Sequence, residues 1–178
     1  MSLLQPDIIG FQEVFSPKAL HALTSTQNLP YFATVSDPSV RAGYIYEKPV
    51  VALASKFPII SLEAVKPRVN VLKDLKLQTD FNFSRPPLRA ELEIDGFGRV
   101  LVYVVHLKSQ RSQLESALNE VDDTLRDISA SLLAQVHGRF ASTIQRGVEA
   151  ALIYQDMVDE MHKQQRPVIL MGDLNDSL

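Results

Sequence analysis

The stretch Pro167-Val168-Ile169-Leu170-Met171-Gly172-Asp173-Leu174-Asn175-Asp176 joins four apolar residues to a turn of carboxylate and amide side chains. A short apolar run bounded by proline and glycine is typical of a buried β-strand. The segment therefore predicts a buried strand over 168–171 that ends in chemically useful groups, Asp173 and Asn175. In α/β sheets, ligands bind outside the carboxyl ends of such strands.

Two other apolar segments end in the same way. Residues 7–11 are followed by Gln12 and Glu13, and the almost wholly apolar run 100–105 is followed by His106. Taken one at a time, each of these polar residues is also a common loop residue. Together, two carboxylates, an imidazole and an amide at three strand ends suit phosphate chemistry with a hard cation.

The rest of the first half reads as short strands with one helix. Ser16 and Pro17 predict a helix start, and that helix ends near Ser25. Strands are predicted at 50–54 and 59–65 around a turn at 56–58, and at 88–94, where apolar and polar residues alternate. The sequence Asp95-Gly96-Phe97-Gly98 predicts a hairpin that leads into a central strand buried on both faces.

The hydrophobic period changes after Ser112. Leucine and other apolar residues spaced four and three apart from Leu114 to Leu132 predict an amphipathic helix, which Gly138 should break. A second helix is predicted over 142–163. Strands interleaved with helices predict an α/β fold.

Composition excludes several classes of protein. The 178 residues contain no cysteine, which excludes disulfides and thiolate chemistry, and no apolar run long enough to cross a membrane. The first residues lack the basic start and apolar core of a signal peptide, and the compartment stays open. The net charge is −3, with +3 in residues 61–111 and −6 in residues 112–178. This asymmetry fits either a solvated acidic helical surface or a basic middle that faces an anionic ligand.

Four segments, in order, resemble the successive motifs of the endonuclease/exonuclease/phosphatase superfamily: residues 6–13, 54–59, 105–109 and 172–176. The resemblance spans nearly the whole chain and is weakest at residues 66–80. It implies a four-layer α/β sandwich of two mixed β-sheets with outer helices, here incomplete. Residues 1–178 would then form a single partial domain with a helical insertion at about 112–140.

The resemblance also implies roles for individual residues. Glu13 matches the metal-binding glutamate, with Mg²⁺ as the ion and Mn²⁺ as an alternative. His106 matches the histidine that bonds the scissile phosphate or assists the leaving group. Asp173 matches the aspartate that orients the attacking water, and Asn175 matches its partner amide on the phosphate.

Expected roles can also be given for three basic residues. Arg85 resembles an arginine that reaches the substrate phosphate in deoxyribonuclease-like members, and its alternative role is that of a surface arginine before Pro86-Pro87. Arg89 falls in the alternating strand and is expected to be structural. Lys108 is expected to be solvated.

The chain also departs from the family pattern. Members carry an asparagine on a strand before the Gln-Glu strand and an Asp-His pair in their last stretch, and neither is found in this sequence. The expectation is therefore a central fragment of the domain that turns over little substrate by itself. Unpaired sheet edges in such a fragment would favour self-association.

The implied function is Mg²⁺-dependent hydrolysis of a phosphodiester or phosphomonoester by in-line attack of water. The substrate, nucleic acid or a phospholipid headgroup, is not resolved by these residues. The alternatives are a non-catalytic binding or scaffold member of the same fold, and an unrelated α/β protein whose strand ends match by accident.

Overall fold

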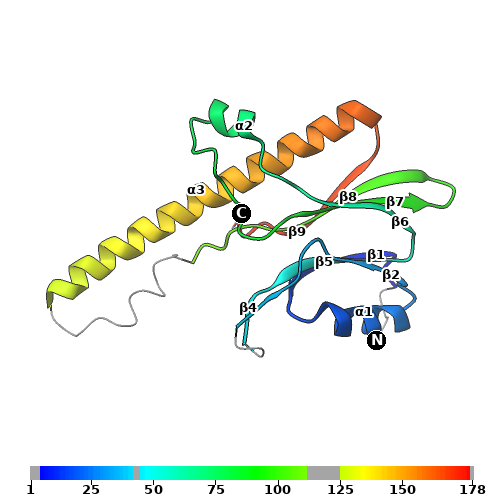
Figure 1. Ribbon diagram of the computed structural model, residues 1–178, viewed down its shortest axis with the longest axis horizontal. Coiled ribbons are helices and arrows are strands. Elements are labelled where there is room, and N and C mark those ends of the chain that lie inside the picture. Colours follow the sequence, from blue (N-terminus) through cyan, green and yellow to red (C-terminus); the bar gives the residue numbers. More distant parts are fainter. Residues whose placement is uncertain (1–4, 42–44, 112–124, 177–178) are drawn as a thin grey trace.

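The structure is a computed structural model that describes residues 5–41, 45–111 and 125–176. Two β-sheets lie face to face, with a helix on the outer side of each (Figure 1). The strands are β1 (Ile8–Val14), β2 (Tyr31–Ala33), β3 (Ser39–Arg41), β4 (Ile45–Lys48), β5 (Val50–Ser55), β6 (Ile59–Ala64), β7 (Leu88–Ile94), β8 (Gly98–His106) and β9 (Val168–Asp173). The helices are α1 (Pro17–Thr26), α2 (Val69–Asp74) and α3 (Leu125–Gln164).

The layers confirm the predicted α/β sandwich. One sheet has the order β1-β5-β2 and the other has the order β6-β7-β8-β9, while β3 and β4 form a separate pair. Helix α1 covers the outer face of the first sheet, and α3 lies along the outer face of the second (Figure 1). The second sheet is mixed, because β8 and β9 run parallel, whereas the described strands of the first are all antiparallel.

Strand β8 is buried on both faces, as its apolar sequence predicts. Its residues alternate between two cores: Val100, Val102 and Val104 face the other sheet, while Tyr103 and Val105 pack under α3. The predicted hairpin from β7 to β8 is also confirmed, with Ile94 paired to Gly98. Both hairpin glycines, Gly96 and Gly98, have positive φ angles of 74° and 91°, which favour residues without a Cβ.

The segment at 56–58 connects the two layers. The predicted strands on either side of it are confirmed as β5 and β6, but β5 belongs to the first sheet and β6 to the second. The hydroxyl of Ser55 accepts a 2.9 Å hydrogen bond from the backbone N–H of Phe57, which supports the bend where the chain changes sheets. Helix α2 lies within residues 66–80, for which the sequence predicts no helix or strand.

The prediction that Gly138 breaks the helix is wrong. Helix α3 runs without interruption through Gly138, so the predicted second helix at 142–163 is its second half. One glycine inside a helix costs only about 1 kcal/mol relative to alanine, which the flanking turns offset. The part of the expected insertion at 112–124 lies outside the described residues. No helix in the described part of the chain is both long and apolar enough to span a membrane.

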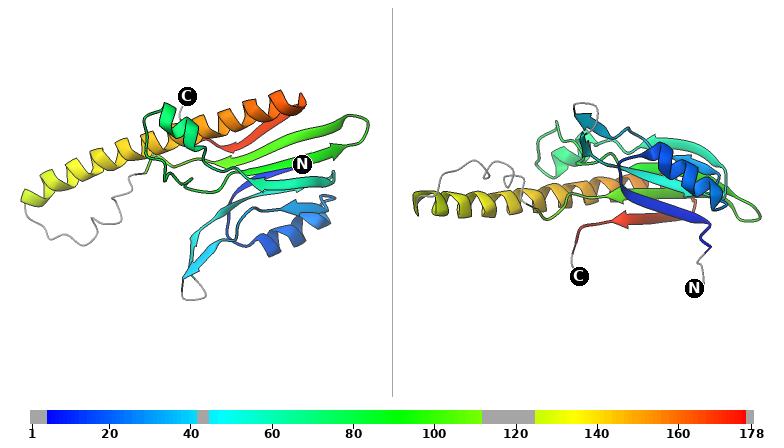
Figure 2. Two further views of the ribbon diagram at one scale, coloured as in Figure 1. Left: turned by 45° about the horizontal axis from the view of Figure 1, so that its top comes forward. Right: turned by 90° about the horizontal axis from the view of Figure 1, so that it is seen from below.

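The prediction of a buried final strand is also wrong. Ile169 and Leu170 of β9 are 37% and 41% exposed, because β9 is the edge strand of its sheet. Strand β1 is the edge of the other sheet, and the two lie at the same side of the sandwich (Figure 2). Gly10 of β1 sits close to the side chain of Met171 there.

Candidate functional site

His106 and Asp173 end two adjacent parallel strands. They are register partners in the β8–β9 ladder, so their side chains emerge at the same edge of the sheet. The Nε2 atom of His106 lies 3.8 Å from Oδ2 of Asp173, beyond hydrogen-bond distance but close enough for an electrostatic interaction. The His106 side chain is buried, whereas that of Asp173 is 52% exposed. The pair therefore joins a buried imidazole to a carboxylate at the surface.

Gly172 allows the two strands to approach at this point. A Cβ at Gly172 would lie 1.9 Å from the carbonyl oxygen of Val105, and its φ angle is 136°. Both observations require a residue without a side chain. The glycine before Asp173 therefore sets how closely Asp173 approaches His106.

The turn after β9 holds Asn175 beside the same strand ends. The backbone N–H of Asn175 donates a 2.8 Å hydrogen bond to Oδ1 of Asp173, and its side-chain amide donates one of 2.9 Å to the carbonyl of Leu107. These bonds support the positive φ angle of 53° at Asn175, which asparagine tolerates better than most residues. The turn thus fixes the Asp173 carboxylate and the Asn175 amide together.

Glu13 lies on the other sheet, and its carboxylate acts electrostatically on His106. The pairing of β1 with β5 shifts register between Phe11 and Val14, and Glu13 within this bulge has a φ angle of 54°. A bulge turns a side chain away from the regular alternation of the strand. The side chain of Glu13 is exposed there, free of the core that Val14 enters.

Four charged groups act on the imidazole of His106. Burial lowers its pKa below the usual 6.5, and the nearby positive charge of Arg85 lowers it further. The opposing negative charges come from the carboxylates of Asp173, Glu13 and Glu149. Three of the residues predicted from the sequence, Arg85, Asp173 and Glu13, therefore act electrostatically on the imidazole of His106. Nδ1 of this ring is buried and has no hydrogen-bond partner in the described part of the chain.

Glu149 is a site residue that the sequence did not reveal. Its side chain, 1% exposed on α3, accepts a 2.6 Å hydrogen bond from the N–H of Ser84 and one of 2.7 Å from the N–H of Lys108. One of these amides precedes Arg85 and the other follows His106 by two residues. Glu149 therefore ties together the two loops that carry these side chains.

A signal for Glu149 does exist in the helix pattern. The buried polar residues Ser142, Glu149 and Asp156 recur every seven residues, next to the apolar stripe that contains Val148 and Leu152. A seven-residue spacing places them on one helix face. Polar residues on a face that packs on a sheet must have partners, which indicates contacts with loops or buried cations.

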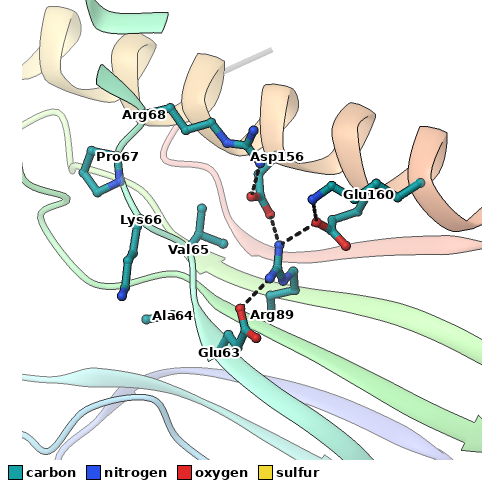
Figure 3. Close-up of a pocket in the computed structure, with 10 residues that line it drawn as sticks. Glu63, Ala64, Val65, Lys66, Pro67, Arg68, Arg89, Asp156 and Glu160 are labelled. Atoms are coloured by element: carbon teal, nitrogen blue, oxygen red, sulfur yellow. Dashed lines mark hydrogen bonds and ion pairs between the residues drawn. The ribbon is translucent and has the colours of Figure 1, made fainter. Parts of the chain in front are cut away.

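Asp156 organises an ion-pair network with Arg68 and Arg89 (Figure 3). It accepts hydrogen bonds from Tyr103, Arg68 and Arg89, and Arg89 also pairs with Glu160. Burial of the Asp156 carboxyl raises its pKa, but these hydrogen bonds outweigh that effect, so the pKa lies below its usual value of 3.8. The expectation that Arg89 is structural fits this network.

Lys108 differs from expectation. It is half-buried, and its ammonium donates hydrogen bonds to the carbonyls of Ser109 and Arg111 rather than lying solvated. These bonds curl the loop that follows His106. The other histidines are exposed helical residues, as expected: His21, His137 and His162.

The described residues fit a hard cation in chemical type. Among them, no group of three or more histidine, aspartate or glutamate side chains clusters as an all-protein metal cage would. Mg²⁺ is nevertheless commonly held by one or two carboxylates, with water and substrate phosphate completing its shell. Glu13 is an exposed carboxylate that acts on His106, the candidate phosphate-binding side chain, and it therefore meets that requirement.

The chain resembles a known protein family and several solved structures. Residues 1–178 match the Endonuclease/Exonuclease/phosphatase family. The human nocturnin catalytic domain, solved with a bound sulfate anion, is 18% identical, with a TM-score of 0.59 over 97% of this chain and 52% of that one. Sphingomyelinase C from Streptomyces griseocarneus is 18% identical, with a TM-score of 0.51 over 96% and 52%. The chain thus spans about half the length of these structures, and no curated protein sequence matches it.

Proposed function

The chain belongs to the endonuclease/exonuclease/phosphatase family, and on that premise we propose that it carries part of the centre of a Mg²⁺-dependent phosphoesterase. The reaction is hydrolysis of a phosphodiester or phosphomonoester by in-line attack of water, and Mn²⁺ can replace Mg²⁺. The observation that carries the proposal is the junction of His106 with Asp173 at two parallel strand ends, under the charges of Arg85 and Glu13.

The neutral imidazole of His106 binds the substrate phosphate. Because its pKa is lowered, it keeps one N–H donor and one acceptor nitrogen at neutral pH. The donor bonds a phosphate oxygen, where negative charge grows in the transition state, and Arg85 adds positive charge to the same group. The bound sulfate of the nocturnin structure is a tetrahedral anion of the same kind.

Asp173 and Asn175 act on the water side of the reaction. The exposed carboxylate of Asp173 accepts a hydrogen bond from the attacking water, and the turn bond from Asn175 holds that carboxylate in place. Glu13 would hold the metal ion, which supplies electrophilic charge to the phosphate oxygens when bound. Separating the groups that bind the anion from those that orient water favours in-line geometry.

Hydrolysis of bis(p-nitrophenyl) phosphate tests the proposal, with p-nitrophenyl phosphate as the monoester. The chain is assayed over long incubations with Mg²⁺, Mn²⁺ or EDTA, because slow turnover is expected. Glu13→Gln should abolish the response to Mg²⁺, and His106→Ala, which removes the N–H donor, should lower kcat by about 10²–10³-fold. If the rate of hydrolysis in EDTA and in both variants equalled that of the wild-type chain in Mg²⁺, the proposal would be contradicted. No hydrolysis and no Mg²⁺ binding would instead favour the scaffold alternative.

A further inference from the structure

A hollow lined by three arginines lies between α3 and the loop that follows His106. Its volume is about 420 Å³, and its lining consists of Gln110, Arg111, Arg139, Thr143 and Arg146. None of these described lining residues carries a carboxylate. Guanidinium groups present paired N–H donors that match phosphate oxygens, so this composition suits an anion.

The rim of this arginine hollow is fixed by buried contacts. The hydroxyl oxygen of the fully buried Ser142 lies 2.9 Å from the carbonyl oxygens of both Arg111 and Gly138, and its single O–H can donate to either. Arg146 donates one of 3.3 Å to the carbonyl of Lys108. The loop therefore rests on the helix at two points beside the hollow, whose lining side chains are mostly exposed.

The charges in the arginine hollow differ from those elsewhere in the protein. Arg68, Arg89, Arg99 and Arg166 all form ion pairs with carboxylates. Among the ion pairs between described residues, none involves the three arginines of the hollow. The first group of charges therefore contributes to fold stability, whereas no described carboxylate pairs with those in the hollow, where Arg146 is bonded to the carbonyl of Lys108.

The arginine hollow adjoins the candidate phosphate site. Gln110 lines the hollow, and its side-chain amide donates a 3.2 Å hydrogen bond to the carbonyl of Asn175. Asn175 in turn bonds the Asp173 carboxylate. One polar side chain thus separates the hollow from the turn that holds the proposed catalytic groups.

We propose that the arginine hollow binds a second phosphate of the substrate, one covalently joined to the phosphate that His106 binds. The proposal rests on the proposed function and specifies its substrate: an ester with successive phosphates, as along a single oligonucleotide strand. A phospholipid headgroup with one phosphate would leave the hollow unused.

Binding of fluorescein-labelled oligothymidylate, measured by anisotropy in EDTA so that no turnover occurs, tests this. Arg111→Ala and Arg139→Ala should each weaken binding by about threefold to tenfold and reduce the slope of log K against log salt by about 0.7. The matched control is Lys18→Ala, which removes one exposed positive charge on α1. It should change affinity by less than about twofold.

Thymidine monophosphate separates the two phosphate sites. Its affinity should fall in His106→Ala, which lacks the N–H donor, and stay unchanged in the two arginine variants. If the arginine variants leave oligonucleotide affinity intact, or if Lys18→Ala lowers it equally, the hollow does not bind a second phosphate. Either result would leave the proposed function unaffected. Arginine-dependent binding with neither hydrolysis nor Mg²⁺ binding would support the hollow and contradict the proposed function.

Discussion

The carboxylate of Glu149 accepts a 2.7 Å hydrogen bond from the backbone N–H of Lys108, two residues after His106. Its other oxygen accepts from the N–H of Ser84, next to Arg85. A carboxylate can accept both bonds, whereas a glutamine amide can accept only one and presents an N–H to the other donor.

Glu149→Gln should therefore destabilise the protein by about 1.5–3 kcal/mol and accelerate hydrogen exchange at Ser84 and Lys108. Urea unfolding and exchange monitored by NMR measure the two effects. The control is Glu63→Gln, which changes a 64% exposed carboxylate and should cost less than about 1 kcal/mol. Equal losses in both variants would show that Glu149 has no special role.

Gly172→Ala should disrupt the β8–β9 junction. The added Cβ meets the carbonyl of Val105, which is backbone and cannot rotate away, so we expect a loss of more than about 3 kcal/mol. Gly147→Ala is the control, because a Cβ there meets nothing within 4 Å on helix α3. That change should stabilise the protein by about 1 kcal/mol. Thermal unfolding of the two variants should shift in opposite directions.

The His106 pKa should respond to its neighbours with predictable sign. Arg85→Ala removes a positive charge and should raise the pKa, whereas Asp173→Asn removes a negative charge and should lower it. Titration of the ring proton by NMR follows this directly. Because the folded pKa lies below 6.5, protonation opposes folding, and the wild-type protein should lose stability as the pH falls below 6.5. A His106 pKa above 6.5 would contradict the burial that the structure shows.

Asp156→Asn should cost about 3 kcal/mol at neutral pH, since it leaves the partly buried Arg68 and Arg89 without their carboxylate. The Asp156 pKa is lowered from 3.8, so the stabilisation is present above pH 3.8 and is lost as the pH falls through the lower folded value. Urea unfolding at several pH values should show the two proteins converging in acid. Tyr103→Phe, which removes one hydrogen bond to Asp156, should cost only about 1 kcal/mol.

Self-association through β9 remains a prediction. Its edge is unpaired in the described sheet and exposes Ile169 and Leu170, which favours pairing with a second copy. Light scattering after size exclusion should show a dimer that Leu170→Lys reduces. Leu23→Lys is the control, because Leu23 is 60% exposed on α1, away from this edge. A monomer at high concentration would contradict the prediction.

The sequence predicted most strands because their burial pattern is local. Leu88–Ile94 and the run after Gly98 carry enough alternation and apolar length to identify β7 and β8. Exposure of β9 could not be predicted in this way, since it depends on what lies beside the strand and not on its own residues. The sheet to which β5 or β6 belongs is likewise set by long-range pairing.

The candidate site shows the same contrast between local sequence patterns and long-range contacts. His106 and Asp173 were predicted as partners because they end apolar strands, and the ladder places them in register. The partners of Glu149 are backbone amides at Ser84 and Lys108, which no residue pattern reveals. Residue types thus predict polar side chains at strand ends better than those that hold loops.

Helix α3 places constraints on insertions as well as on substitutions. Three residues of this one helix hold other parts of the fold. Ser142 contacts the loop of the arginine hollow, Glu149 binds the two site loops, and Asp156 holds the buried ion pairs. Each residue advances a helix by roughly 100°, so one residue added or removed between 142 and 156 would turn some of these groups away from their partners. Length changes in this segment should be tolerated only in whole turns, even where every remaining residue is conservative.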